Sequence, residues 1–117
     1  EVVLSADLYQ GAPVVTVSVG GQKIADIAIN AQRKNGDVQK NILKVPESLK
    51  NKVIVLTFNN DLYGGAGLDR NIYVHSLNMD GKTLGLSKAQ WTGNNNRYEG
   101  FYDGRLMSSG SMTLQNP

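Results

Sequence analysis

The chain has 117 residues and a mass of 12.7 kDa, which is the size of a single domain. It contains no cysteine, which excludes disulfide scaffolds, zinc knuckles, iron–sulfur sites and thiol chemistry. A net charge of +2 gives no basic surface for nucleic acid, and no apolar run approaches the ~20 residues that span a bilayer. The hydrophobic fraction of 40% predicts a folded globular domain.

Short strands are predicted through the first half of the chain. Residues 15–19 alternate three valines with Thr16 and Ser18, which predicts a strand with one buried face. Gly20-Gly21 indicates a two-residue hairpin turn, and residues 24–29 supply the returning strand. Residues 33–37 form a polar turn. Residues 38–45 are predicted as a further strand that ends at Pro46.

The second half continues the pattern. Residues 53–58 form a continuous apolar run, which predicts a central strand buried on both faces. Residues 72–77 are predicted as another strand that ends at Asp80-Gly81, a type I′ turn dipeptide, and residues 111–114 as the last strand. Short strands joined by Gly, Asn and Asp turns predict an all-β fold, an antiparallel, jelly-roll-like β-sandwich.

Standard catalytic motifs are absent. The single histidine, His75, lies within a predicted strand and has no second His or Cys with which to hold a metal. We therefore expect an ordinary packing or surface role for it. No G-x-S-x-G elbow and no phosphate-binding glycine loop occurs, so the sequence gives no support for a serine hydrolase or a nucleotide site.

The segment 58–71 combines glycines, acids and amides between two strands. Asp61 and Asp69 lie near its two ends, which adjoining strands would bring together, and Asn59 or Asn60 adds amide oxygen. Calcium prefers six to eight oxygens of these kinds. The loop is not an EF-hand, because Tyr63 takes the third position after Asp61 and no Glu closes the frame. Alternatively, Asp61 caps a turn and Asp69 pairs with Arg70 or with a neighbour on the surface.

Three motifs carry a resemblance to a known family: Asn59-Asn60-Asp61, then Asp69-Arg70-Asn71-Ile72-Tyr73-Val74, then Asn78-Met79-Asp80-Gly81. With these motifs the sequence resembles the calcium-dependent, xylan-binding carbohydrate-binding modules of family sixty, which are related by circular permutation to family thirty-six. The likeness covers roughly residues 4–84.

The resemblance implies a β-sandwich with a calcium-binding loop at one end, where the ion binds two neighbouring hydroxyls of one sugar. It implies that Asp61 and Asp69 are carboxylate ligands, that Asn60 is a ligand or a loop former, and that Arg70 braces the loop. Asp80 replaces the usual Asn before the turn glycine, which a hairpin tolerates. With two carboxylates we expect a dissociation constant for calcium of about 10⁻⁴–10⁻³ M.

Aromatic residues offer a second means of holding sugar, because ring faces pack on C–H faces. Tyr63 lies in the proposed metal loop, and we expect it to contact sugar. Trp91 lies in a polar stretch, where it is either a sugar platform or a core anchor that closes one end of the sandwich.

We therefore expect residues 1–117 to form one non-catalytic, calcium-dependent carbohydrate-binding domain. The expected partner is a polysaccharide, xylan first, with galactan and glucan open; nucleic acid and membranes are not expected partners. We further expect a monomeric module of a larger secreted protein that tethers a covalently linked catalytic domain to its substrate. Two alternatives are a structural or adhesive sandwich whose calcium only stiffens a loop, and a small glycan-cleaving enzyme that uses Asp61 and Asp69 as acid and base.

Overall fold

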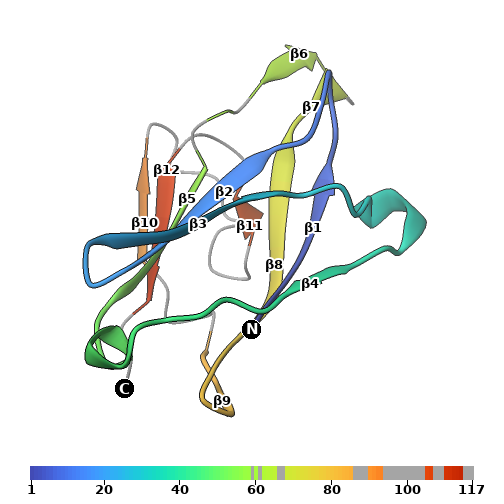
Figure 1. The fold of residues 1–117 in the computed structure, drawn as a ribbon. Coiled ribbons are helices and arrows are strands. Elements are labelled where there is room, and N and C mark those ends of the chain that lie inside the picture. Colours follow the sequence, from blue (N-terminus) through green and yellow to red (C-terminus); the bar gives the residue numbers. More distant parts are fainter. Residues whose placement is uncertain are drawn as a thin grey trace.

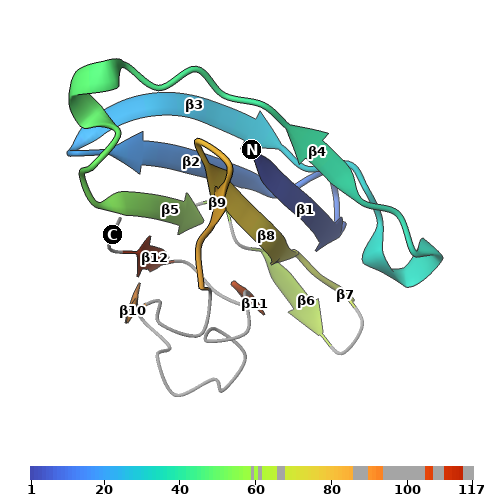
Figure 2. The ribbon, with the colours of Figure 1, turned by 90° about the horizontal axis from the view of Figure 1, so that it is seen from below.

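The protein is an antiparallel β-sandwich, seen here in a computed structural model. The structure describes residues 1–58, 60, 62–65, 68–85, 90–93, 105–106 and 110–114. Figures 1 and 2 show two curved layers that face each other, with a small hairpin projecting from one end. The predicted all-β sandwich is confirmed.

The first sheet has the strand order β11-β8-β1-β4, and β9 pairs with the C-terminal end of β8. Its strands are β1 (Val2–Asp7), β4 (Gln39–Asn41), β8 (Asn71–Met79), β9 (Lys82–Thr83) and β11 (Arg105–Leu106). The register pairs Asp7, the last residue of β1, with Asn71, the first residue of β8. This pairing brings two polar residues from distant parts of the sequence to one end of the sandwich.

The second sheet has the order β10-β12-β5-β2-β3. Its strands are β2 (Val14–Val19), β3 (Gln22–Ala28), β5 (Ile54–Phe58), β10 (Gln90–Gly93) and β12 (Gly110–Leu114). The remaining elements are the β6–β7 hairpin (Tyr63–Gly65 and Leu68–Asp69) and two 3₁₀ turns, η1 (Arg33–Asn35) and η2 (Glu47–Leu49). No helix in the described residues is long and apolar enough to cross a membrane.

The strand predictions mostly hold. Val15, Val17 and Val19 of β2 are buried, and Gly20 and Gly21 adopt φ values of 61° and 82°, as a type I′ hairpin requires. Asp80 and Gly81 form the same kind of turn, with φ values of 52° and 82°. The last strand, β12, is also confirmed.

Two strand predictions are corrected. The segment 38–45 contributes only the three residues of β4, because its apolar side chains Leu43 and Val45 pack against the core after the pairing with β1 has ended. β5 is central, as expected, but its burial alternates instead of covering both faces. In this antiparallel sheet one face of β5 meets the core, whereas Val55 and Thr57 on the other face are only half-buried.

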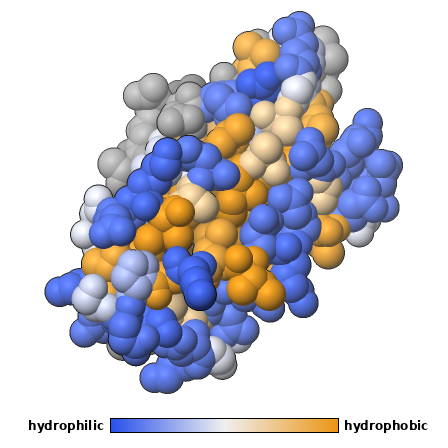
Figure 3. All heavy atoms as spheres, in the orientation of Figure 1, coloured by the Kyte–Doolittle hydropathy of each residue, from blue (hydrophilic) through white to orange (hydrophobic). Residues whose placement is uncertain are grey.

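The core lies between the two sheets and is built from the inward-facing apolar side chains of both. The largest fully buried side chains include Leu4, Ile54, Leu56, Phe58, Ile72 and Met112. Burying such a side chain contributes about 1.5–3 kcal/mol. Figure 3 shows hydrophobic side chains along the seam between the layers, flanked by hydrophilic ones.

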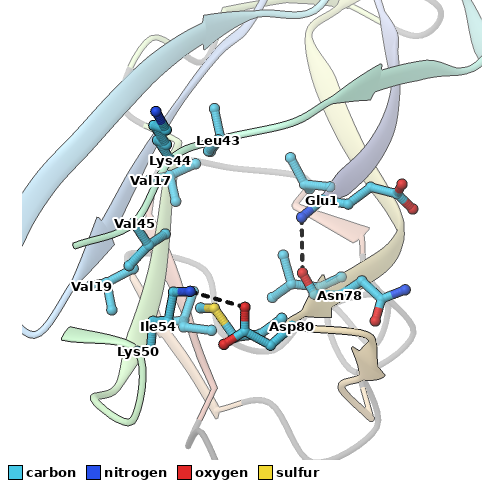
Figure 4. A pocket seen from close by; sticks show the side chains of 13 residues that line it. Glu1, Val17, Val19, Leu43, Lys44, Val45, Lys50, Ile54, Asn78 and Asp80 are labelled. Atoms are coloured by element: carbon cyan, nitrogen blue, oxygen red, sulfur yellow. Dashed lines mark hydrogen bonds and ion pairs between the residues drawn. The ribbon is translucent and has the colours of Figure 1, made fainter. Parts of the chain in front are cut away.

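A cavity of about 180 Å³ opens between the sheets near the N-terminus. Valine, leucine and isoleucine side chains form most of its wall, and an ion pair between Lys50 Nζ and Asp80 Oδ1 (3.1 Å) crosses its rim (Figure 4). The N-terminal amine donates to the Asn78 carbonyl at 2.8 Å on the same rim. This cavity lies at the opposite end of β8 from the hairpin described next.

Candidate functional site

The β6–β7 hairpin forms a projection at one end of the sandwich (Figure 1). Tyr63 pairs with Asp69, and the Arg70 amide donates to the Leu62 carbonyl at 3.0 Å. The hairpin leads directly into β8. Asp69 is therefore held at the junction between an exposed hairpin and the sheet.

Arg70 ties this hairpin to the loop between β1 and β2. Its Nε donates to the Tyr9 carbonyl at 2.8 Å, its Nη2 to the Gln10 carbonyl at 2.6 Å, and its Nη1 to the Asn60 carbonyl at 2.9 Å. The planar guanidinium can satisfy three carbonyls in different directions at once. The bracing role implied for Arg70 fits these bonds.

Asn60 uses both ends of its side-chain amide in the same framework. Its Oδ1 accepts from the Val14 amide at 2.9 Å, and its Nδ2 donates to the Ala12 carbonyl at 3.3 Å. Of the two roles considered for Asn60, ligand or loop former, these bonds describe the loop former.

Tyr9 lies against the backbone of β6. A Cβ added at Gly64 would collide with the Tyr9 ring, reaching 2.6 Å from Cζ, so glycine leaves the space that the ring occupies. Gln10, with φ of 51°, and Gly11, with φ of 113°, make the tight turn that follows Tyr9. The loop between β1 and β2 therefore supplies two of the three carbonyls that Arg70 binds, and its Tyr9 ring packs against the hairpin.

A polar pocket of about 300 Å³ opens where Asp69 joins the sheet. It is lined by Ala6, Asp7, Leu8, Gln32, Lys34, Asp69 and Asn71. Asp7 Oδ2 accepts from the Tyr73 hydroxyl at 2.5 Å and from Asn71 Nδ2 at 3.0 Å. Asn71 is 5% exposed, and its Oδ1 is buried with no hydrogen-bond partner among the described residues.

The other predicted site residues are described less fully. Asp61 and Asn59 lie outside the described residues, and for Tyr63 in β6 and Trp91 in β10 only the backbone is described. Both Asp69 and Asn60 belong to the hairpin end. Across the described part of the chain, no group of three or more His, Cys, Asp or Glu residues is placed to hold a metal ion.

Asp7, Asn71 and Tyr9 are the residues at this end that the sequence did not single out. Asn71 stands within the Asp69-Arg70-Asn71 motif, so a signal for it existed. The stretch from Ala6 to Tyr9 also resembles the family, but no pattern in it indicates a metal-site role for Asp7 or a contact between Tyr9 and the hairpin. Outside this end, His75 is exposed on β8, and its Nε2 lies 2.6 Å from Ser5 Oγ. That contact agrees with the ordinary role expected for His75.

Comparisons with known proteins point to one family. Residues 1–94 match the model of a family described as Ca-dependent carbohydrate-binding modules, xylan-binding (CBM60). A solved structure described as vCBM60 in complex with galactobiose is similar, with a TM-score of 0.73 and 20% identity over 99% of this chain and 96% of the other. A selenomethionine form of vCBM60, with 20% identity, has a TM-score of 0.63 over 98% and 87% of the two chains. A comparison with curated protein sequences found no match.

Proposed function

Because the chain belongs to this family of calcium-dependent, xylan-binding carbohydrate-binding modules, we propose that it binds polysaccharide without cleaving it, through a calcium ion at the β6–β7 end. The carrying observation is the polar pocket at Asp69, where carboxylate and amide oxygens converge beside an exposed hairpin. Sugars are neutral and well hydrated, so hydrogen bonds alone gain little over water. A site in which a metal ion also coordinates the sugar hydroxyls can bind the sugar more strongly than hydrogen bonds alone.

The residues at this end fit calcium. All the candidate ligands are oxygens, which a hard cation prefers, and one of them, Asn71 Oδ1, is buried without a partner in the described part of the chain. Asp69 would hold the ion together with Asp61, the second carboxylate that the family resemblance implies. A bound calcium ion supplies open positions that two vicinal sugar hydroxyls can fill.

The surrounding residues hold the proposed calcium site in position in the absence of ligand. Arg70 and Asn60 hold the hairpin against the loop between β1 and β2, so little ordering remains for the binding step. Tyr63 belongs to the hairpin itself, and we propose it as a sugar contact; Trp91 is a second candidate platform.

Xylan is the proposed first target, and galactan and glucan chains are further candidates because their vicinal hydroxyls could chelate the same ion. We also propose that the module is extracellular and tethers a covalently linked enzyme to its substrate. The modest calcium affinity expected of such a site supports this location, since the site would fill outside a cell.

Calorimetric titration tests the proposal. Xylohexaose and a galacto-oligosaccharide are titrated into the protein in calcium and then in excess EDTA, and we expect heat that EDTA abolishes. Asp69→Asn should abolish both calcium and sugar binding. Asp80→Asn is the matched control, because it removes a carboxylate at the other end of β8 and leaves an Asn-Gly turn that suits type I′ geometry.

The alternatives give different results. Calcium binding without heat from any glycan would support the structural or adhesive sandwich instead. Sugar binding that persists in EDTA would refute the calcium mechanism and move attention to Trp91. Release of reducing ends from xylan would support the enzyme.

A further inference from the structure

The pocket at Asp69 is formed partly by the sheet. The last residue of β1, Asp7, and the first residue of β8, Asn71, pair with each other and line the pocket together with Asp69. A volume of about 300 Å³ has room for an ion with several waters, since each water takes about 30 Å³.

Among the described residues, one end of the Asn71 side-chain amide has a hydrogen-bond partner and the other end has none. Its Nδ2 donates to Asp7 Oδ2 at 3.0 Å, and a carboxylate can only accept, so this bond fixes which end of the amide is the oxygen. Oδ1 is then the end without a hydrogen-bond partner in the described part of the chain, on a side chain that is 5% exposed. A buried amide oxygen left in this state is costly and calls for a ligand.

Asp7 is held rigidly in the same pocket. Its Oδ2 accepts both the Tyr73 hydroxyl and Asn71 Nδ2, and the Arg33 guanidinium lies 4.5 Å from the centre of the Tyr73 ring. Among the described residues, Oδ1 of Asp7 has no hydrogen bond. A carboxylate fixed through one oxygen presents the other in a defined position, as a preorganised cation ligand requires.

We infer that Asp7 and Asn71 are ligands supplied by the sheet to the calcium ion that Asp69 holds, so that the ion bridges the hairpin and the sheet. The inference rests on the proposed function for the presence of the ion. It extends that function by assigning two further ligands, Asp7 outside the 58–71 segment and Asn71 at its end, and by leaving Asn60, whose amide already bonds the loop at both ends, in the framework. Asp7, Asp69 and the Asn71 amide give calcium three of its six to eight oxygens, in addition to those proposed from Asp61.

Lys34 lines the same pocket, and its cation reduces the net negative charge there. With Asp7 and Asp69 opposing one lysine, the pocket still favours a cation. The partial neutralisation agrees with a weakly held calcium ion.

The test measures calcium binding alone, by calorimetry on the full chain without sugar. Asn71→Ala and Asp7→Asn should each weaken calcium binding by about tenfold or more, a loss comparable to those caused by removing groups that support a metal site. Asn78→Ala is the matched control. It lies on the same strand at the far end, and its Oδ1 is likewise buried without a hydrogen bond in the described part, so it should leave calcium affinity within twofold.

A second variant guards against misfolding. Asn71→Asp places a third carboxylate beside Asp7 and Asp69, so the ligand role predicts a lower melting temperature in EDTA and a larger calcium-induced rise than in the wild type. A purely structural role predicts the same loss in both buffers.

The outcomes separate the two proposals. If the wild type binds calcium and sugar while Asn71→Ala and Asp7→Asn keep full calcium affinity, the inference is wrong and the proposed function stands. If these variants lose sugar affinity only, the pocket receives a sugar hydroxyl, and the inference is again wrong. If the wild type binds calcium but no sugar, and the variants lose calcium, the inference holds and the proposed function fails. If the wild type binds no calcium, both fail.

Discussion

Replacing Arg70 by lysine should destabilise the protein because no lysine can copy the three-way contact of the guanidinium. The bonds to the carbonyls of Tyr9, Gln10 and Asn60 are 2.8, 2.6 and 2.9 Å long. Lysine keeps the charge but reaches at most one of these carbonyls well. Hydrogen bonds to charged groups contribute about 1.5–3 kcal/mol each, and the Gln10 bond is exposed, so losing two should cost about 2–3 kcal/mol.

For a domain of this size that loss corresponds to a fall in melting temperature of about 6–15 °C. The assay is thermal unfolding by circular dichroism in EDTA, which removes any contribution from bound metal. Arg33→Lys is the matched control, because Arg33 contacts the Tyr73 ring by a cation–π interaction of about 0.5–1 kcal/mol and braces no loop. If Arg70→Lys melted within about 3 °C of the wild type, the argument that Arg70 holds the hairpin would be refuted.

Two further predictions concern other contacts. Gly64→Ala should lower the stability of the fold by about 1–3 kcal/mol and weaken sugar binding, because its Cβ meets the Tyr9 ring. Calorimetry on Gly64→Ala and on the double variant Gly64→Ala/Tyr9→Ala checks this prediction. If the added Tyr9→Ala change restored none of the lost stability, the steric cause would be contradicted. Hydrogen bonds from Lys23 and then Thr16 hold the pKa of Asp26 below its usual 3.8, so its contribution to stability is present above that pH and is lost as pH falls through the lowered pKa. Urea unfolding should therefore show Asp26→Asn to be less stable than the wild type at pH 7 but not at pH 2, and a difference that persists at pH 2 would exclude the ionised pair as its source.

Most strands of the second sheet could be predicted from local pattern, although β10 was not. The alternating valines of β2, the Gly20-Gly21 turn and the apolar run of β5 each contain their own signal. By contrast, β1 went unpredicted. β1 begins with three apolar residues in a row, and its polar Ser5 is buried by tertiary packing, so burial in β1 does not follow the alternation of polar and apolar residues that identifies β2.

For the candidate site too, some residues could be identified from the sequence, whereas other roles depended on the tertiary structure. Asp69 and Asn60 were identified because they fall in one contiguous segment whose acids and amides suit calcium, whereas the bracing role of Arg70 came from the family resemblance. Whether Asn60 was a ligand or a loop former could not be decided, since the answer depends on Val14 and Ala12, 46 and 48 residues away.

The sequence by itself therefore determined an all-β domain without cysteine chemistry, a polar loop suited to calcium and a likeness to one family of carbohydrate-binding modules. Only the tertiary structure decided which residues surround Asp69. Asp7 reaches Asn71 through the antiparallel register of β1 and β8, 64 residues apart, and Tyr9 reaches Gly64 through the loop that Arg70 holds. Such contacts depend on how distant strands pair, which no local pattern of residues specifies.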